Sequence, residues 1–399
     1  MRKKICIGDL GTIITGKTPS KTNKSYYGDD VAFIKPTDIS VDSKFTYETE
    51  EMYSKLAAEK YISSLIPKGA ICIPCIGTIG TKMTMTHCAC YTNQSINTII
   101  CNENYDNEYV YYLMKNFLPN LKSYNLGTAS GREFISKSNF EKIEIVAEQN
   151  KNIQKEIGKF LSRYDSLIEN YQKQIKLLEE AAQRLYKEWF VDLRFPGHEN
   201  TKIVDGVPEG WEKKKIKDLI TLLNGYAFKS ASFDDSGKYK IVTIKNVKDG
   251  TFDGGNVSCI KSIPERMPLH CKLVQGDILL SLTGNVGRVC MVIGGNFLLN
   301  QRVAKLKSKY PAFTYCLFRN NDMFISINNL ANGAAQQNVS PIRIGELPLM
   351  IANIEILESF EIIAWRMVSQ ILSLSSQILY LTEARDRLLP KLMSGEIEV

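Results

Sequence analysis

The chain of 399 residues repeats itself after about 200 residues, and this repeat limits the folds that it can adopt. The stretch 68–80 aligns with 275–287 at an offset of 207, and the same offset aligns Asn93-Gln94 with Asn300-Gln301. The offset is 209 near residues 7–16, 204 near 135–145 and 203 near 180–185. Because it declines slowly along the whole chain, we interpret the matches as two copies of one structural unit.

The first part of each copy, about 140 residues long, has short apolar runs separated by Gly, Asn, Asp and Pro. Such runs predict strands joined by turns. They lie at 70–73, 96–100, 240–244 and 277–282. Residues 109–117 and 310–318 read as short helices, so each copy begins with an α+β body. Gly77-x-x-Gly80 and Gly284-x-x-Gly287 predict tight turns, where glycine accepts a positive φ without steric cost.

The second part of each copy is helical, with apolar residues every seven positions over five heptads. In the first copy these are Ile157, Tyr164, Tyr171, Leu178 and Leu185, and adding 203 gives Phe360, Met367, Leu374, Leu381 and Leu388. We expect a second set three residues further on, in which Gln174 and Gln377 share one core position as a polar pair suited to fixing the register. The stripe is widened by further apolar residues, Leu161, Ile168, Ile175, Ile371 and Ile378. An apolar stripe along a helix of roughly 60 Å must be covered, and the matching stripes predict that the two helices pair in an antiparallel coiled coil.

The predicted fold class is therefore α+β: two pseudo-twofold related domains separated by a long antiparallel two-helix coiled coil. The predicted boundaries are 1–148 for the first domain, 149–190 for the central spacer helix and 191–211 for a connector. The second domain is predicted at 212–350 and the C-terminal spacer helix at 351–399.

Composition and charge indicate the compartment and the kind of partner. The start of the chain does not resemble a signal peptide, the apolar runs look too interrupted to cross a membrane, and ten scattered cysteines suit a reducing cytoplasm. The net charge is +7, and residues 210–350 carry 19 basic and 10 acidic side chains against 17 and 16 in residues 1–148. The second domain is the electropositive one, and nucleic acid is a reasonable partner.

With this organisation, two local motifs make the chain resemble a known family. One is the bridge of residues 187–199, Lys-Glu-Trp-Phe-Val-Asp-Leu-Arg-Phe-Pro-Gly-His-Glu, which leads into Val207-Pro208-Glu209-Gly210-Trp211-Glu212. The other is the terminal stretch 387–397, Arg-Leu-Leu-Pro-Lys-Leu-Met-Ser-Gly-Glu-Ile. Together with the repeat, they resemble the specificity subunit of Type I restriction–modification systems over essentially the whole chain.

The resemblance implies a non-catalytic subunit in which two target-recognition domains each read half of a split double-stranded DNA site. Two modification (methyltransferase) subunits are the expected partners, together with restriction (translocase and nuclease) subunits. S-adenosylmethionine and ATP are expected on those partners, with no cofactor on this chain. Two readers of unlike sequence predict an asymmetric bipartite site, with half-site centres roughly 10 base pairs apart.

A phosphate-binding pattern occurs near the N-terminus. Residues 11–18 fit G-x-x-x-x-G-K-[ST], a loop that needs a strand before it and a helix after it. No apolar helical face follows, and the second copy has Gly225-Tyr226-Ala227 in place of Gly-Lys-Thr. We favour a basic, hydroxyl-rich loop that touches DNA, and a nucleotide-dependent enzyme remains a third-ranked alternative.

Several cysteines have a spacing that suits zinc. Cys72 and Cys75 lie near His87, Cys88 and Cys90. In the second copy, however, Leu279 and Leu282 replace Cys72 and Cys75, which favours buried thiols over a metal site. The chain also lacks an Asn-Pro-Pro-aromatic run and the patterns G-x-G-x-x-G and G-x-S-x-G, so we predict no catalytic residues and no metal.

The candidate DNA contacts are polar or basic residues in loops at equivalent places of both copies, since Arg, Lys, Asn and Gln suit base edges and phosphates. In the first domain they are Lys17, Thr18, Ser20, Lys35, Asp38, Thr78, Lys82, Asn93, Gln94, Ser130 and Arg132. In the second they are Tyr226, Lys229, Lys245, Asn246, Asn285, Arg288, Gln301, Arg302, Gln336, Gln337 and Asn338.

Two alternatives remain open for these predictions. The pairs Asn93-Gln94 and Asn300-Gln301 could cap strands in both copies instead of contacting DNA. For the whole chain, the runner-up is a coiled-coil scaffold that binds proteins and has no DNA specificity.

Overall fold

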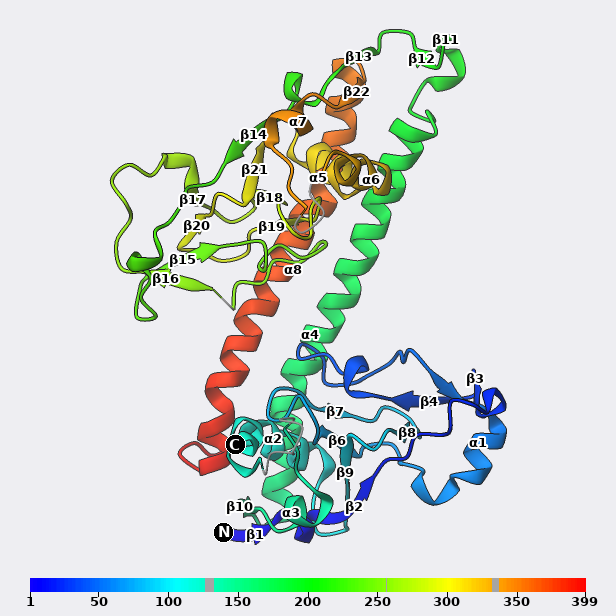
Figure 1. Cartoon of the computed structure of the whole chain (residues 1–399), viewed down its shortest axis with the longest axis vertical. Helices are drawn as coiled ribbons and strands as arrows, with labels where there is room; N and C mark the ends of the chain where they lie inside the picture. The colour runs from blue at the N-terminus through cyan, green and yellow to red at the C-terminus, as the bar shows by residue number, and fades with distance from the viewer. Residues whose placement is uncertain (126–132, 256, 332–336) are drawn as a thin grey trace. The chain divides into compact units, whose positions relative to one another are not determined.

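The computed structural model describes residues 1–125, 133–255, 257–331 and 337–399. The chain forms two compact units (Figure 1). The first unit contains residues 1–170 and 380–399, and the second contains residues 171–379. Each unit therefore holds one α+β body and a part of both long helices.

The described residues of the first unit form ten strands and three short helices before the first long helix. The strands are β1 (Arg2–Cys6), β2 (Gly11–Thr15), β3 (Tyr27–Gly28), β4 (Val31–Ile34), β5 (Met52–Tyr53), β6 (Ile71–Pro74), β7 (Thr84–Met85), β8 (Tyr91–Thr92), β9 (Ile96–Cys101) and β10 (Glu144–Glu148). The helices are α1 (Lys55–Lys60), α2 (Asn107–Phe117), α3 (Lys137–Glu141) and the long α4 (Lys151–Tyr186), which continues into the second unit.

In the described part of this body, the strands form two four-stranded sheets and one strand pair. One sheet is antiparallel, in the order β2-β9-β6-β7, and the other has the order β3-β5-β4-β8 with β4 parallel to β8. Strand β1 pairs antiparallel with β10, so that Arg2 lies opposite Glu148 and the two ends of residues 2–148 are joined. The largest core of this unit contains Ile13, Ile71, Ile99 and the buried face of α2.

The described residues of the second unit repeat most of these elements in the same order, with no helix corresponding to α1 and with an additional helix, α6, after α5. Its strands are β11 (Ile203–Val204), β12 (Val207–Pro208), β13 (Glu212–Lys215), β14 (Thr221–Asn224), β15 (Tyr239–Val242), β16 (Ser258–Ile260), β17 (Lys272–Leu273), β18 (Ile278–Ser281), β19 (Val289–Met291), β20 (Phe297–Leu299), β21 (Val303–Lys307) and β22 (Pro348–Ile351). Its helices are α5 (Pro311–Arg319), α6 (Asn321–Leu330), α7 (Pro341–Gly345) and the long α8 (Ile354–Ser394).

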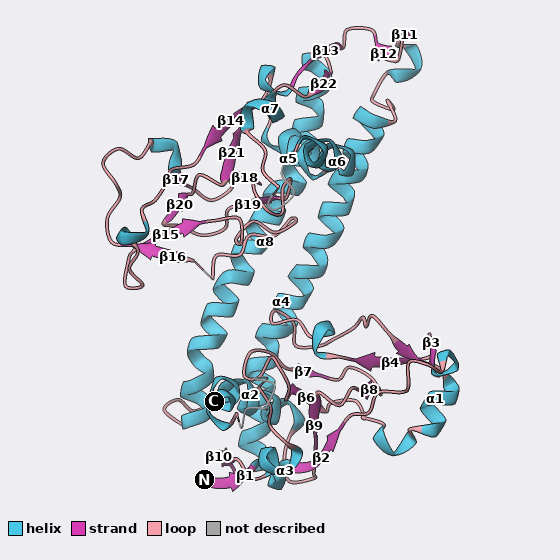
Figure 2. Ribbon diagram, viewed as in Figure 1, coloured by secondary structure: helices cyan, strands magenta, loops and turns pink. Residues whose placement is uncertain are grey.

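Its sheets match those of the first unit. The order β14-β21-β18-β19 corresponds to β2-β9-β6-β7, and β15 runs parallel to β20 as β4 does to β8. Strands β13 and β22 pair antiparallel, as β1 and β10 do. Strand and helix are mixed in both bodies (Figure 2), so the prediction of an α+β fold with a long spacer helix is confirmed.

Both units contain paired segments of α4 and α8. In the first unit, Ile157 and Leu161 of α4 share a core with Leu389 and Leu392 of α8. In the second unit, Ala182 of α4 shares a core with Phe360 and Ala364 of α8. The start of α4 thus meets the end of α8, and the end of α4 meets the start of α8, as an antiparallel pair requires.

The buried stripe differs in one respect from the predicted one. Its second set of positions lies four residues after the first set instead of three: Leu161, Ile168 and Ile371, which were expected only to widen the stripe, are buried together with Ala364. At the predicted positions, Leu167 is 38% and Ile363 is 44% exposed, and Gln174 and Gln377 are exposed. The prediction of a polar Gln174–Gln377 core position was therefore wrong. A 3.5-residue repeat allows a step of either three or four, and the packing of each body selects four.

The aromatic residues of the bridge motif form a cluster in the second unit. Phe190 lies 4.9 Å from Phe360 and 5.8 Å from Trp211 between ring centroids, and Phe195 lies 4.9 Å from Trp211. A π-helical turn, Lys187–Val191, follows α4 and carries Trp189 and Phe190 into this cluster. The motif therefore fixes the connector at the point where α4 ends and α8 begins.

Among the described residues, α8 is long and apolar enough, by length and composition alone, to cross a membrane. The sequence had suggested that no segment meets this criterion. Between Arg366 and Glu383, the polar residues that interrupt the apolar positions of α8 are uncharged, such as Ser373 and Gln377, so this stretch carries no charge that opposes burial in a membrane. Since core helices of soluble proteins meet the same criterion, the finding is weak evidence for a membrane.

Candidate nucleic-acid interface

The topology of the first unit brings most of the candidate loops to one edge of the antiparallel sheet. Neighbouring strands run in opposite directions, so β2 and β6 end at the edge where β9 begins. The parallel strands β4 and β8 end there too, because the backbone N–H of Asn93 donates to the carbonyl of Ile34 at 3.1 Å. We call this edge, formed by the loops after β2, β4, β6 and β8, the loop edge of the first unit.

The second unit has the same loop edge, formed by the loops after β14, β15, β18 and β20. There the backbone N–H of Asn300 donates to the carbonyl of Val242 at 3.1 Å. The loop before α7 joins this edge, because Thr283 forms a β-bridge with Asn338 and the N–H of Gly284 donates to the carbonyl of Gln337 at 2.9 Å. In the first unit, Ile76 and Phe134 form the equivalent bridge.

Gly16 and Gly225 explain how the two edges acquire the same backbone path. A Cβ atom on Gly16 would lie 2.1 Å from the carbonyl oxygen of Thr92, and one on Gly225 would lie 2.1 Å from that of Asn300. Only glycine allows the strand end to cross the neighbouring loop so closely. The residues immediately after these glycines, Lys17 and Tyr226, are thereby placed at corresponding positions.

The first loop of the first unit is held by side chains that the sequence did not single out. The Tyr53 hydroxyl donates to the carbonyl of Lys17 at 2.6 Å, and the Tyr27 hydroxyl donates to the carbonyl of Pro19 at 2.9 Å. Lys17, Thr18 and Ser20 are exposed, and the Thr18 hydroxyl donates to the side chain of Gln94, which is also exposed. No sequence signal identifies the two tyrosines, because they come from the other sheet.

Two further candidates, Lys35 and Asp38, form ion pairs and hydrogen bonds with neighbouring residues of the same unit. Lys35 forms ion pairs with Glu50 at 2.8 Å and Glu51 at 3.5 Å. Partial burial opposes the charged form of Lys35, but these carboxylates outweigh it and raise its pKa. The Asp38 carboxylate accepts hydrogen bonds from the backbone N–H groups of Lys35 at 2.7 Å and Glu50 at 3.2 Å.

The turn after β6 carries Thr78, which is exposed, and Lys82, which is half-buried. Gly77 and Gly80 have φ values of +80° and +70°, and Gly284 and Gly287 have +72° and +86°. The prediction of tight glycine turns is confirmed. Three further candidates, Ser130, Arg132 and Gln336, lie outside the described residues.

The alternative role of Asn93 and Asn300 is the one that their side chains perform in the structure. The side-chain oxygen of Asn93 accepts from the N–H of Ser95 at 3.0 Å, and that of Asn300 accepts from the N–H of Arg302 at 3.2 Å. These asparagines close the turn before β9 and β21, a common use of asparagine in turns. Gln94, Gln301 and Arg302 are exposed beside them.

In the second unit the candidates divide into exposed and buried residues. Lys229, Lys245, Asn285, Gln301, Arg302, Gln337 and Asn338 are exposed, and Tyr226 and Arg288 are half-buried. Asn246, in contrast, is 1% exposed: its oxygen accepts from the N–H of Thr243 and its amide donates to the carbonyl of Asp253, both at 2.8 Å. The Asn338 oxygen accepts from the Thr283 hydroxyl at 3.0 Å.

His270, which no candidate set included, also supports this edge. Its Nε2 lies 2.8 Å from the carbonyl oxygen of Asn224, the last residue of β14, and fixes the strand end beside Gly225 and Tyr226. The histidine comes from the opposite sheet, so its role depends on a tertiary contact that sequence spacing does not reveal.

The structure gives the phosphate-binding pattern another explanation. Residues Gly11–Thr15 are β2, and this strand leads into a loop and a short 3₁₀ turn, Lys24–Tyr26. A Cβ on Gly11 would lie 2.0 Å from the carbonyl oxygen of Ile100, so both glycines of the pattern serve close strand contacts. The helix N-terminus that cradles phosphates in such loops does not come after this strand.

Of the cysteines with the zinc-like spacing, Cys72 and Cys75 are buried thiols in or beside β6, Cys90 is buried and Cys88 is exposed. Burial raises the pKa of Cys72 to about 12 and that of Cys75 to about 11, which keeps both protonated. Within the described residues, no group of three His, Cys, Asp or Glu side chains is placed to hold a metal ion.

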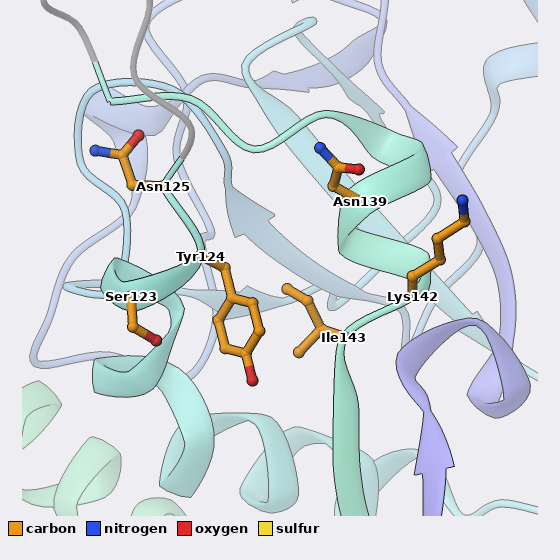
Figure 3. Close-up of a pocket in the computed structure, with 6 residues that line it drawn as sticks. All are labelled: Ser123, Tyr124, Asn125, Asn139, Lys142 and Ile143. Atoms are coloured by element: carbon orange, nitrogen blue, oxygen red, sulfur yellow. The ribbon is translucent and has the colours of Figure 1, made fainter.

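None of the described candidate residues lines either of two surface hollows. One, of about 370 Å³, is lined by Ser123, Tyr124, Asn125, Asn139, Lys142 and Ile143. Figure 3 shows the ring of Tyr124 beside Ile143, with the Lys142 side chain pointing away from them. The other, of about 430 Å³, includes Lys272, Lys305 and Lys307, and there Lys305 pairs with Asp277 at 2.7 Å.

The loop edges present exposed amide, hydroxyl and basic side chains on a frame that is built twice. Such side chains suit base edges and phosphates. Among the candidate residues that the structure describes, exposed basic side chains are more numerous on the second edge, where Lys229, Lys245 and Arg302 lie, than on the first, where Lys17 lies. Chemically, both edges are suited to binding nucleic acid.

Comparison with known proteins identifies the family. Residues 2–180 and 208–366 match the family described as the Type I restriction modification DNA specificity domain. The chain is 28% identical to the Type I restriction enzyme MjaIX specificity subunit of Methanocaldococcus jannaschii, over 98% of this chain and 93% of that protein. It is 36% identical to the HindI specificity subunit of Haemophilus influenzae, over 43% of this chain and 38% of that protein.

A solved structure supports the fold. The S subunit of a Type I restriction–modification system from M. genitalium is similar with a TM-score of 0.59 at 16% identity, over 98% of this chain and 96% of that one. At this identity the likeness concerns the fold alone. Since the two family matches together cover most of the sequence, this chain belongs to the Type I restriction–modification specificity subunits.

Proposed function

We propose that each recognition domain reads one half of an asymmetric, bipartite double-stranded DNA site through its loop edge. The observation that carries this proposal is the repeated frame around Gly16 and Gly225, which presents different side chains in the two units. Lys17 corresponds to Tyr226, and Thr78 corresponds to Asn285. Since direct readout depends on which donors and acceptors meet the base edges, equal frames with unlike side chains favour two unlike half-sites.

The recognition domains in this proposal are residues 1–148 and 212–350, joined through spacer helices 149–190 and 351–399 and the connector 191–211. A helical spacer leaves less freedom in the distance between half-sites than a flexible linker would. The bases between the half-sites are then not read.

The chain itself is proposed to be non-catalytic. It docks two modification subunits, which bind S-adenosylmethionine and methylate adenine, and restriction subunits, which use ATP. We place the assembly in the cytoplasm, where reducing conditions suit its cysteines. A protein-binding scaffold without DNA specificity is the competing function.

Methylome sequencing tests the proposal. DNA from cells that carry an active system, with and without this gene, is compared for methyladenine. We expect a split motif of two unlike halves that disappears without the gene. Unchanged methylation would contradict the proposal and favour the scaffold.

A domain exchange tests the division of labour. Residues 212–350 are replaced by the second recognition domain of another specificity subunit, and the assembled complex is assayed again. We expect one half of the methylated motif to change and the other half to remain. A change in both halves, or in neither, would argue against one domain per half-site.

A further inference from the structure

In the first unit, three elements meet at one buried carboxylate. Asp165, on α4, is 7% exposed, and its Oδ2 accepts from the hydroxyl of Tyr112, on α2, at 2.5 Å. Its Oδ1 accepts from the guanidinium of Arg385, on α8. The body of the domain, its own spacer helix and the other spacer helix are thus joined at a single side chain.

The second unit has a related joint at the same tyrosine position. Tyr315, on α5, lies 203 residues after Tyr112, the offset of the helical repeat, and its hydroxyl donates to Glu179 on α4. Here the nearby arginine, Arg319, belongs to α5 itself, with its Nε 3.6 Å from the Glu179 carboxylate. This joint connects the body to α4, whereas the joint in the first unit also includes α8.

The buried joint in the first unit constrains orientation. Tyr112 is fully buried and Arg385 is 9% exposed, so little water competes for their hydrogen bonds. Burial opposes the ionised form of Asp165, but the positive charges of Lys115 and Arg385 and the hydrogen bonds from Tyr112 and Arg385 lower its pKa. A buried carboxylate that is kept ionised in this way tolerates only geometries that retain its partners.

The joint gives the first domain a further, directional attachment to α4. The body is linked covalently to α4 at residues 148–151, and Ile157 and Leu161 of α4 pack into its core. Through α2, Tyr112 attaches the body to α4 some 14 residues beyond the link, at Asp165. Because a hydrogen bond depends on the directions of its donor and acceptor, this attachment restricts the angle between the body and the helix more sharply than apolar packing does.

We propose that Tyr112, Asp165 and Arg385 are positioning residues that set the angle of the first recognition domain on the spacer helices. They thereby restrict the number of unread base pairs that the complex accepts between its half-sites. Each extra base pair moves a half-site by about 3.4 Å and turns it by about 35°, so a body held at a fixed angle rejects altered spacers. The inference rests on the proposed reading of a split site.

The test uses the complete methyltransferase complex with Tyr112→Phe, which removes the hydroxyl and keeps the ring. Methylation is sequenced on a library of the native half-sites with spacers one base pair shorter and longer. We expect methylation of the altered spacers, relative to the native spacer, to rise about tenfold, the factor that corresponds to one hydrogen bond, with unchanged base preferences. Asp165→Asn should raise the methylation of shorter and longer spacers further still.

The matched control is Tyr111→Phe, which removes the hydroxyl of a neighbouring tyrosine that is 2% exposed. This variant should methylate the native and altered spacers in the same ratio as the wild type. If Tyr112→Phe lowers methylation at every spacer by the same factor, the hydroxyl only stabilises the fold and the inference is overturned. The inference is also overturned if Tyr112→Phe and Asp165→Asn both keep the wild-type preference for the native spacer length. If the wild-type complex methylates no split site, the proposed function itself fails.

Discussion

Gly158 and Glu361 occupy the same position in the two repeats, 203 residues apart, and satisfy the same helix terminus in different ways. Glu361, on α8, accepts hydrogen bonds from the backbone N–H groups of Ala312 and Phe313 at the start of α5, both at 2.9 Å. In the first repeat, α2 is capped by its own Asp106, and Gly158 leaves room for that turn. A Cβ on Gly158 would lie 2.8 Å from the N–H nitrogen of Tyr109.

The first prediction concerns this cap. Glu361→Ala leaves the first N–H groups of α5 without their acceptor, and α5 has no side-chain cap of its own. We expect the free energy of unfolding of the second unit to fall by about 1–2 kcal/mol, the usual cost of losing an N-cap. Urea denaturation followed by circular dichroism measures the loss.

A substitution at the equivalent position of the first repeat, Gly158, serves as the control for Glu361→Ala. Gly158→Ala should destabilise the first unit by about 2 kcal/mol, because the new methyl group meets the α2 backbone. Hydrogen exchange assigns each loss to its unit, with faster exchange in α5 for Glu361→Ala and in α2 for Gly158→Ala. A loss confined to the other unit in either variant would contradict the assignment.

The second prediction concerns acid stability. The pKa of Asp165 is lowered in the folded protein, so its contribution is present above the ordinary aspartate pKa and disappears as the pH falls through the lowered value. At pH 7 we expect Asp165→Asn to cost about 3 kcal/mol, because it weakens a buried ion pair. The gap between wild type and variant should narrow below about pH 4.

Arg385→Met provides the companion measurement. It leaves a buried carboxylate without its arginine, so it should be destabilising at pH 7 and less so in acid, where Asp165 becomes protonated. Denaturation curves at a series of pH values test both variants. A gap that stays constant or grows as the pH falls would argue against an ionised Asp165.

The sequence predicted the parts of the fold that depend on repeated local patterns. The α+β bodies, the glycine turns at Gly77 and Gly284 and the antiparallel stripes all result from residue type and spacing. The spacing did not decide whether the buried second set lies three or four residues after the first, because a heptad permits both and apolar residues occur at both. Contacts such as Tyr112 with Asp165 decide which face is buried.

For the candidate site, the sequence indicated which loops to consider but not the role of each side chain. Equivalent loops in two copies supplied the candidate residues, and the sheet topology, which the sequence did not give, brings most of these loops to one edge. Individual side chains were harder to assign, because Asn93 and Asn300 close turns and Asn246 is buried between backbone groups. The sequence does not show whether a polar residue in a loop faces solvent or hydrogen-bonds to the backbone of a turn.

The third prediction uses two neighbours with opposite environments. Lys245 is exposed on the second loop edge and Asn246 is 1% exposed. Lys245→Ala should leave stability within about 0.5 kcal/mol and weaken DNA binding with a salt slope reduced by about 1. Asn246→Ala should cost about 2 kcal/mol of stability, because buried backbone groups lose their partners.

Fluorescence anisotropy of the assembled complex on a duplex that contains its site, at several salt concentrations, measures the first effect, and thermal melting measures the second. If Lys245→Ala binds DNA like the wild type at every salt concentration, this lysine makes no phosphate contact. If Asn246→Ala is as stable as the wild type, the buried hydrogen bonds are not needed for the turn.

The fourth prediction tests the frame of the loop edge. Gly16→Ala would place a methyl group 2.1 Å from a backbone oxygen that cannot move without its strand, so we expect a loss of about 3 kcal/mol. The loop of Lys17–Pro19 should shift with it, and methylation should lose selectivity for the half-site read by the first domain.

Gly77→Ala is the matched control: its Cβ meets nothing within 4 Å, and only its φ of +80° opposes alanine, at a cost of about 1 kcal/mol. Denaturation and methylome sequencing of both variants measure the difference. Equal losses in the two variants would show that the close crossing at Thr92 does not determine the position of the loop.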